Sequence, residues 1–188
     1  MAVELHSGQA RKGSTIPYLG HLLGVCGLVI DAGGSEDEAV AAVLHDAVED
    51  QGGALTLAAI RKRFRSNVAA IVEGCSDTDA IPKPPWLTRK AAYLEHLQTA
   101  EPSVLRVSAA DKLNNLRSIV RDYSDIGEAL WARFSPDADQ IWYYGALLEV
   151  FERRLPGAVT QELRQAFSTL LDLMGPSRRD PPNSAVAS

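Results

Sequence analysis

Apolar residues recur three and four positions apart along most of this chain, in stretches separated by prolines and glycines. This spacing places apolar side chains on one face of an α-helix, and no window shows the strict alternation expected of a half-buried strand. We therefore predict an all-α fold, a single bundle of about eight to ten helices. The expected helices span residues 2–10, 17–32, 36–50, 56–64, 67–76, 86–100, 102–121, 125–133, 136–154 and 160–174.

The length of the chain, 188 residues, suits one domain with a substantial core. We place that domain at residues 1–174 and expect a flexible tail at 175–188, where proline, serine and arginine accompany few apolar residues. The segment DTDAIPKPP, residues 77–85, contains three prolines and no periodicity. It is expected to form a loop, and loops of this length often carry function.

Charge and hydropathy argue against several classes of protein. The first residues show neither the charged start nor the apolar run of a signal peptide, and no stretch approaches about eighteen consecutive apolar residues. We therefore expect a soluble, cytoplasmic protein that does not bind membranes. The net charge of -5 argues against broad electrostatic binding to nucleic acid. An anionic ligand would have to be held by a local cluster of basic groups or by a metal ion.

The most informative short segment is LHDAVED, residues 44–50, which follows the apolar, alanine-rich DEAVAAV. In a continuous helix His45 and Glu49 lie one turn apart, as do Asp46 and Asp50, so all four side chains can line one rim of a pocket. Any one of them alone could be a helix cap or a surface charge. Together they predict a functional site at the end of a packed helix.

A metal ion would account for this cluster, because imidazole and carboxylate groups suit Mn, Fe, Zn or Co and the cation offsets the repulsion between the acids. His45 and Asp46 alone supply too few ligands. The further candidates are His21, inside the apolar HLLGVCGLVI, and Asp111, inside VLRVSAADKLNNLR. Considered separately, His21 could be a core or surface histidine, and Asp111 could pair with the adjacent lysine.

Four segments, in this order along the chain, resemble a known family: HSGQARKGSTIPYLGH, AAVLHDAVED, IVEGCSD and SAADKLNNLRS. The order His, His-Asp, Asp at positions 21, 45/46 and 111 is similar to that of the HD superfamily of metal-dependent phosphohydrolases. The four segments together resemble the hydrolase domain of RelA/SpoT proteins, and the chain looks most like a small alarmone hydrolase. The resemblance covers about residues 5–155 and implies a single HD-type helical domain.

The resemblance also implies roles for the residues at matching positions. One Mn²⁺ ion is expected to bind to four ligands: His21, His45, Asp46 and Asp111. Glu49 and Asp50 would stand beside the attacking water and orient or deprotonate it, because a carboxylate next to a metal ion can accept the proton of the nucleophile.

The residues that resemble the family's nucleotide contacts are Arg11, Lys12, Asn115 and Ser118. Arg11 would lie against the nucleobase, since a guanidinium plane can stack on a purine, and Lys12 would act as a point charge for phosphate. Asn115 and Ser118 would face the nucleoside, although Asn115 could instead bridge helices.

Further contacts come from the residues themselves. Lys83 lies in the proline-rich segment 77–85, and Arg89 and Lys90 follow it. These bases could reach the distal phosphates, or they could belong to a solvated face. Tyr143, in the sequence WYY at residues 142–144, could form a wall for the base, or it could lie in the core.

The activity implied by the resemblance is hydrolysis of the 3′-pyrophosphate of (p)ppGpp, which gives GDP or GTP plus pyrophosphate. Two alternatives remain open on the sequence. The same centre could serve a related nucleotide phosphatase acting on NADPH or on an adenosine alarmone. The chain could also be the antitoxin partner of a toxic alarmone synthetase, acting by binding or by catalysis.

Overall fold

A computed structural model describes residues 1–78 and 82–175 of the chain. The expected loop at 77–85 therefore lies partly outside the described residues, and the expected flexible tail lies outside them after residue 175. Within the described part the regular structure is helical. The one β-type pairing there is an isolated antiparallel bridge between Ala10 and Pro17. The all-α prediction is confirmed.

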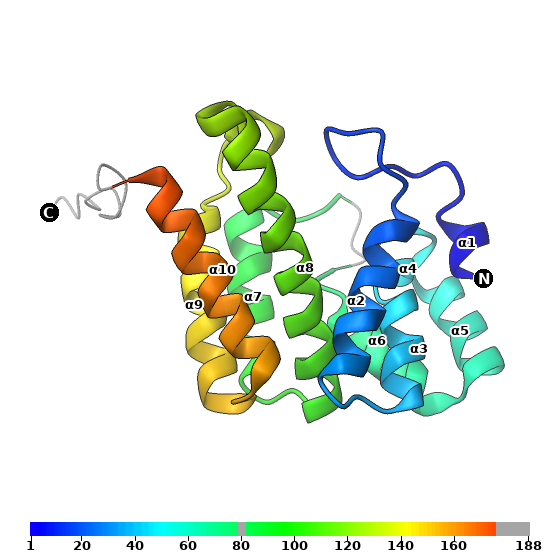
Figure 1. Ribbon diagram of the computed structural model, residues 1–188. Helices are drawn as coiled ribbons and strands as arrows, with labels where there is room; N and C mark the ends of the chain where they lie inside the picture. The colour runs from blue at the N-terminus through cyan, green and yellow to red at the C-terminus, as the bar shows by residue number, and fades with distance from the viewer. Residues whose placement is uncertain (79–81, 176–188) are drawn as a thin grey trace, which may run out of the picture.

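Most helices follow one another along the chain with short connections, whereas α1 and α2 are joined by the longer segment 6–18 (Figure 1). Their bounds are α1 Ala2–Leu5, α2 Leu19–Asp31, α3 Glu36–Leu44, α4 Ala47–Asp50, α5 Gly53–Phe64, α6 Ser66–Cys75, α7 Trp86–Leu97, α8 Pro102–Ile126, the 3-10 helix η1 Gly127–Arg133, α9 Gln140–Arg154 and α10 Ala158–Met174.

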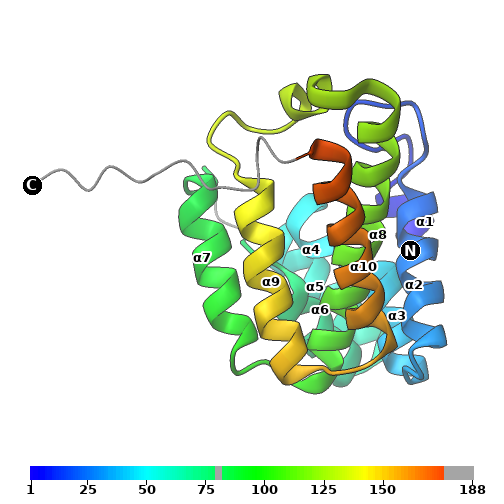
Figure 2. The ribbon, with the colours of Figure 1, turned by 60° about the vertical axis from the view of Figure 1, so that its left-hand side comes forward.

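The longest helix, α8, runs through the middle of the bundle. It contacts α2, α3 and α6 on one side and α9 and α10 on the other, while α7 packs along α9 (Figures 1 and 2). Leu105, Leu113 and Leu116 of α8 have no exposed surface. Apolar residues on successive turns of α8 thus supply the centre of the core, which holds the two halves of the bundle together.

The N-terminal segment differs from the expected helix over 2–10. The helix α1 ends at Leu5, and the chain turns at Gly8, whose φ of 74° lies in the left-handed region. Glycine adopts this conformation without the steric penalty of a side chain. The residues after Gly8 therefore form an irregular segment that leads to α2, which begins at Leu19 rather than at residue 17.

The expected helix over 36–50 is also interrupted. The helix α3 ends at Leu44 and α4 begins at Ala47, so His45 and Asp46 occupy the junction. Both junction residues keep right-handed helical dihedrals, and the amide of Asp50 still donates to the carbonyl of Asp46 at 3.0 Å. The one-turn relation between Asp46 and Asp50 is preserved although the helix is not continuous.

The expected helix starts differ in accuracy. Thr56 and Thr160, the expected first residues of two helices, lie inside α5 and α10, which begin at Gly53 and Ala158. Ser35 forms a capping box with Glu38, so the predicted start at residue 36 is confirmed. The expected start at residue 136 is wrong, because Asp139 accepts from the amide of Trp142 and α9 begins at Gln140. The helix expected over 102–121 continues to Ile126, and the one expected over 125–133 is the 3-10 helix η1.

Among the described helices, none combines the length and the apolar composition that crossing a membrane requires.

Candidate metal centre and adjoining cavity

Three separate parts of the bundle bring the four predicted metal ligands together. His21 comes from α2, His45 and Asp46 from the junction between α3 and α4, and Asp111 from α8. Ligand atoms of His21, His45 and Asp46 all lie within 4.8 Å of one another. Oδ1 of Asp111 lies 3.3 Å from Nε2 of His21 and 3.5 Å from Nε2 of His45.

The hydrogen bonds of the two histidines determine which ring nitrogen faces this centre. Nδ1 of His45 lies 2.8 Å from the carbonyl of Ala42, which can only accept, so Nδ1 carries a proton. Nδ1 of His21 lies 2.8 Å from Oδ1 of Asn114, an oxygen that also accepts from Arg11, so this nitrogen donates too. In the neutral imidazole, each Nε2 is then left with a lone pair directed at the centre.

The two Nε2 atoms are buried and have no hydrogen-bond partner among the residues that the structure describes. The nearest groups are carboxylates, since Oδ2 of Asp46 lies 3.0 Å from Nε2 of His45 and 3.6 Å from Nε2 of His21. Lone pairs and carboxylate oxygens repel one another unless a cation lies between them. Two imidazole nitrogens and two carboxylates form a donor set that fits a divalent transition metal.

The electrostatic field at the centre favours a positive charge. Burial lowers the pKa of His21 and of His45, but the carboxylates of Asp111 and Asp46 outweigh it and raise the pKa of both rings above the ordinary value. Burial likewise opposes a charge on Asp111, but the ammonium of Lys112 holds the pKa of that carboxyl well below its usual range. Burial also opposes a charge on Asp46, but the imidazole of His45 and the hydrogen bonds of both histidines hold the pKa of that carboxyl well below its usual range. Both acids therefore remain ionised and available as ligands.

The alternative considered for Asp111, a pairing with its neighbour, is present in addition to the histidine contacts. Nζ of Lys112 lies 2.5 Å from Oδ2 of Asp111, and Nδ2 of Asn115 donates to Oδ1 at 2.6 Å. Each carboxylate oxygen thus has its own partner, which fixes the plane of the carboxylate.

Two supporting residues were not identified from the sequence. Tyr18 donates from its hydroxyl to Oδ2 of Asp46, and Asn114 bonds the ring of His21. Both lie in segments quoted above, HSGQARKGSTIPYLGH and SAADKLNNLRS, and this was the available signal. Their partners are 28 and 93 residues away along the chain, so local patterns could not assign their roles.

Glu49 and Asp50, the predicted water-handling acids, lie on α4 directly after the junction. Oε1 of Glu49 pairs with Nζ of Lys83 at 2.8 Å, and Oδ2 of Asp50 accepts from Nε2 of Gln9 at 3.0 Å. The structure therefore places Lys83 against Glu49. Lys83 does not line the cavity described next.

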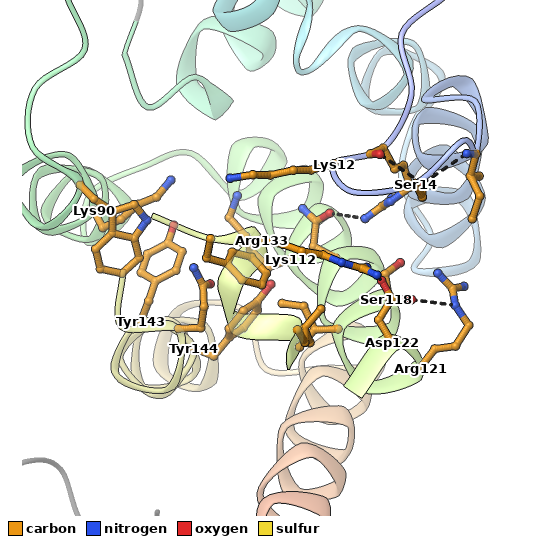
Figure 3. A pocket seen from close by; sticks show the side chains of 18 residues that line it. Lys12, Ser14, Lys90, Lys112, Ser118, Arg121, Asp122, Arg133, Tyr143 and Tyr144 are labelled. Carbon is orange, nitrogen blue, oxygen red and sulfur yellow. Dashed lines mark hydrogen bonds and ion pairs between the residues drawn. The ribbon is translucent and has the colours of Figure 1, made fainter. Parts of the chain in front are cut away.

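Next to the metal centre the structure has a cavity of about 400 Å³ (Figure 3). It lies among the segment 11–16, the start of α7, α8 from Lys112 onward, η1 and the start of α9. Its lining contains five of the six predicted substrate contacts, namely Arg11, Lys12, Asn115, Ser118 and Tyr143. Asn115 and Lys112 connect the cavity to the centre, because both line it and both contact Asp111.

The lining is strongly cationic. Besides Arg11 and Lys12 it contains Lys90, Lys112, Arg121 and Arg133, and the acid among the lining residues is Asp122, which pairs with Arg133 at 2.8 Å. The sequence analysis considered Lys90 as a phosphate contact and Lys112 as a partner of Asp111, but it assigned no role to Arg121 or Arg133, which lie on other elements than the motif residues of the segment 11–16. An excess of cations in a concave site attracts anionic ligands.

Arg11 is held by the amide oxygens of α8. Its Nη2 donates to Oδ1 of Asn115 at 2.8 Å, and its Nη1 donates to Oδ1 of Asn114 at 3.3 Å. Lys12 lies with its ammonium 5.8 Å from the ring centroid of Phe134. These contacts attach the irregular segment before α2 to α8 and to the residue that follows η1.

Tyr143 combines the two roles considered for it. It is only 4 % exposed and packs edge-on against Trp86 at 5.8 Å between ring centroids, as a core residue does. It also lines the cavity, and its buried hydroxyl has no partner in the part of the chain that is described. Burial raises the pKa of Tyr143 to about 12, so the hydroxyl stays protonated at neutral pH and can donate.

Comparison with protein families and with known proteins supports the resemblance seen in the sequence. The model of the HD domain family matches residues 1–142, which include all four predicted ligands. The guanosine-3′,5′-bis(diphosphate) 3′-pyrophosphohydrolase MESH1 of Xenopus tropicalis is 39% identical over 123 residues, covering 64% of this chain and 66% of the relative. The human protein of the same name is 36% identical over the same coverage. The matched region thus spans slightly less than two thirds of these relatives.

Solved structures share the fold. A protein of Listeria monocytogenes EGD-e superposes with a TM-score of 0.69 and 30% identity, covering 79% of this chain and 96% of that protein. A metazoan ortholog of SpoT, described as hydrolysing ppGpp, superposes with a TM-score of 0.71 and 21% identity, covering 90% of this chain and 92% of the ortholog. With its His and Asp residues gathered into a site for a divalent metal ion and its sequence matched over residues 1–142, this chain belongs to the HD domain family.

Proposed function

We propose that this protein hydrolyses the 3′-pyrophosphate of guanosine tetra- and pentaphosphate, releasing pyrophosphate and leaving GDP or GTP. The observation that carries the proposal is the convergence of two unpartnered Nε2 atoms on two ionised carboxylates, beside a cationic cavity of about 400 Å³. Relatives of the chain are named as hydrolases of this bond. The substrate is thus a small nucleotide, and the reaction belongs in the cytoplasm.

We assign Mn²⁺ to the centre, held by His21, His45, Asp46 and Asp111. Two nitrogen and two carboxylate ligands suit Mn²⁺ and leave other divalent transition metals as competitors. When bound, such an ion supplies Lewis acidity toward phosphate and water.

Glu49 and Asp50 handle the water in this proposal. They follow Asp46 by one turn, and a carboxylate at that position can accept a proton from the nucleophile while a second one aligns it. The water oxygen forms a bond to the first phosphorus of the 3′-pyrophosphate, and the bond from that phosphorus to the ribose 3′ oxygen breaks. The 3′ oxygen takes up a proton, so that GDP or GTP and pyrophosphate account for all atoms of substrate and water.

The cavity provides the substrate contacts. Arg11 presents a guanidinium plane, fixed by two amide oxygens, on which a purine can stack. Asn115 and Ser118 on α8 would contact the nucleoside. Lys12 would neutralise phosphate charge in the cavity, and Lys83, paired with Glu49, would do so beside the water-handling acids.

Further phosphate contacts come from residues of α7 and α9, which line the cavity across from the segment 11–16. The hydroxyl of Tyr143 is a protonated donor without a partner among the described residues, and the ammonium of Lys90 lies 5.2 Å from its ring centroid. Asp77 holds Lys90 at 2.6 Å and Arg89 at 2.5 Å, so both cations are kept near this edge.

The test is product analysis with the purified protein and a verified content of Mn²⁺. We expect ppGpp to be converted to GDP and pyrophosphate, and Asp46→Ala to abolish the reaction. Parallel assays with pppGpp, the adenosine counterparts and NADPH rank the substrates. Metal-loaded protein that yields no pyrophosphate from either guanosine nucleotide would contradict the proposal, and faster turnover of NADPH or an adenosine alarmone would reassign the substrate.

The same variant tests the remaining expectation, an alarmone synthetase as partner. On the proposed function, the protein would oppose a toxic synthetase by hydrolysing its product. Co-expression with a synthetase should then restore growth with the wild-type chain and not with Asp46→Ala. Restored growth with the inactive variant would instead indicate neutralisation by binding.

A further inference from the structure

We infer that Gln9 is a positioning residue for the reaction, because it holds in one orientation the carboxylate of Asp50, which lies one helical turn after the predicted metal ligand Asp46. The inference rests on the proposed function in one respect, namely that Asp50 handles the attacking water. Gln9 lies in the motif HSGQ, and neither the metal site nor the cavity lining includes it.

The orientation of the Gln9 amide is determined by its neighbours. Its Oε1 lies 2.7 Å from Nδ1 of His6 and accepts from Nε2 of Gln51 at 2.9 Å, while its Nε2 donates to Oδ2 of Asp50 at 3.0 Å. The flipped amide would place oxygen against the Asp50 carboxylate and NH₂ against the NH₂ of Gln51. Both contacts would be repulsive, so the amide group has a single favourable orientation.

Asp50 needs such a partner because of where it lies. It is exposed, and it is the last residue of the four-residue helix α4, after which Gln51 leaves the helical conformation. A carboxylate at such an exposed helix end can turn toward solvent freely. The hydrogen bond from Gln9 restricts it, and catalytic groups must be held to within a fraction of an ångström.

A buried histidine and a partly buried tyrosine connect Gln9 to the metal centre. His6 is 4 % exposed, and its ring stacks on Tyr18 with 5.4 Å between centroids. The hydroxyl of Tyr18 in turn donates to the metal ligand Asp46. The segment before α2 therefore connects the water-handling acid to a metal ligand through a continuous set of contacts.

The experiment replaces Gln9 by Met, which keeps the length of the side chain without its polar atoms, and by Glu, which keeps the shape but removes the donor. We expect kcat to fall about 10- to 100-fold, the range found for partners that orient active-site ligands, with KM and Mn²⁺ affinity within about two-fold of wild type. The matched control is Gln98→Met, whose side chain accepts from Arg153 far from the site, and it should leave kcat unchanged. A fall in Mn²⁺ affinity or a rise in KM with kcat unchanged would overturn the inference.

A double-mutant cycle shows whether Gln9 acts through Asp50. In an Asp50→Asn background, the Gln9→Met change should reduce kcat by no more than about two-fold, because the group that it positions is already altered. A full additional 10- to 100-fold loss in that background would mean that Gln9 supports the fold or another group, and would overturn the inference.

A crystal structure of Gln9→Met separates this inference from the proposed function. If ppGpp is not a substrate of the wild-type protein, the proposed function fails, yet the Asp50 carboxylate should still be rotated or disordered in the variant. If Gln9→Met does not fold, the same comparison is made with Gln9→Glu. An Asp50 carboxylate that keeps its wild-type orientation without the Gln9 donor would refute the positioning role whatever the substrate is.

Discussion

Single side chains determine whether this centre can bind a metal ion, because the tautomer of each histidine depends on one hydrogen bond. The ring of His45 is set by the carbonyl of Ala42, which no substitution removes. The ring of His21 is set by the side chain of Asn114, which can be changed. Substitution of Asn114, which is not itself a predicted metal ligand, therefore tests how far metal binding depends on the tautomer of His21.

We predict that Asn114→Leu lowers Mn²⁺ affinity about 10- to 100-fold, because the imidazole of His21 loses the acceptor that keeps Nε2 free for the metal. Isothermal titration of the metal-free protein measures the change. Asn67→Leu is the control, since Asn67 bonds Asp37 on the surface and should leave the affinity unchanged. Equal affinities of Asn114→Leu and wild type would show that the ring is oriented by packing alone.

At the scale of single residues, the sequence predicted the four metal ligands but not the residues that hydrogen-bond to the site residues. His21, His45, Asp46 and Asp111 were found as chemically matched types in an ordered motif, and the structure brings them together. The supporting contacts of Asn114 and Gln9 were not found. They join residues 93 and 41 positions apart, and nothing in the local pattern of either segment records that distance.

Among the elements, the irregular segment 10–17 forms one part of the cavity lining. The bridge between Ala10 and Pro17 closes it into a loop that carries Arg11 and Lys12. At its tip Gly13 has φ of 72°, and a Cβ there would lie 2.7 Å from Cδ of Arg133. The loop thus packs directly on η1, across the cavity.

We predict that Gly13→Ala raises KM for the nucleotide several-fold, because the added methyl group displaces either the loop or the Arg133 side chain. Gly33→Ala is the matched control: Gly33 has φ of 74°, and its Cβ would meet nothing within 4 Å. Both substitutions should lower stability by about 1–2 kcal/mol from the left-handed backbone, and only Gly13→Ala should change KM. Steady-state kinetics and thermal unfolding separate the two effects, and equal KM values for the two variants would contradict the prediction.

Some element boundaries were predictable from the sequence. The predicted start at residue 36 is confirmed, and its capping box joins Ser35 to Glu38, only three residues later. The junction at His45 and Asp46 was not predictable, since it carries no glycine or proline and its residues retain helical dihedrals. The tertiary contacts of both side chains with Asp111 and His21 accompany this break in a sequence that reads as one helix.

At the scale of the whole molecule, α10 lies outside the matched HD region of residues 1–142 but belongs to the core. It packs along α8 (Figure 2), and its Leu163 and Leu170 have no exposed surface. The division into a domain at 1–174 and a tail remains a prediction. Chains shortened at the C-terminal or the N-terminal end of α10 test it.

We predict that ending the chain after residue 174 leaves the free energy of unfolding unchanged, whereas ending it after residue 157 lowers it by about 5 kcal/mol. The estimate counts the loss of two buried leucines and Val159 at about 1.5–3 kcal/mol each, of which the chain recovers part by rearrangement. Urea unfolding followed by circular dichroism measures both. A shorter chain as stable as the longer one would show that α10 is not part of the cooperative unit.

The sequence by itself determined that the chain is helical, that it carries the ordered residues of an HD-type centre, and that an anionic ligand would need a local cationic site. The helical class and the need for a cationic site follow from periodicity and net charge, which are local or summed quantities. The HD-type centre follows from the resemblance of four ordered segments to a known family. The tertiary structure decided which histidine nitrogen faces the centre, which bases from α7, α8 and η1 share a cavity with Arg11, and that Gln9 reaches Asp50. These are relations between side chains on separate elements, and they exist only once the helices have packed against α8.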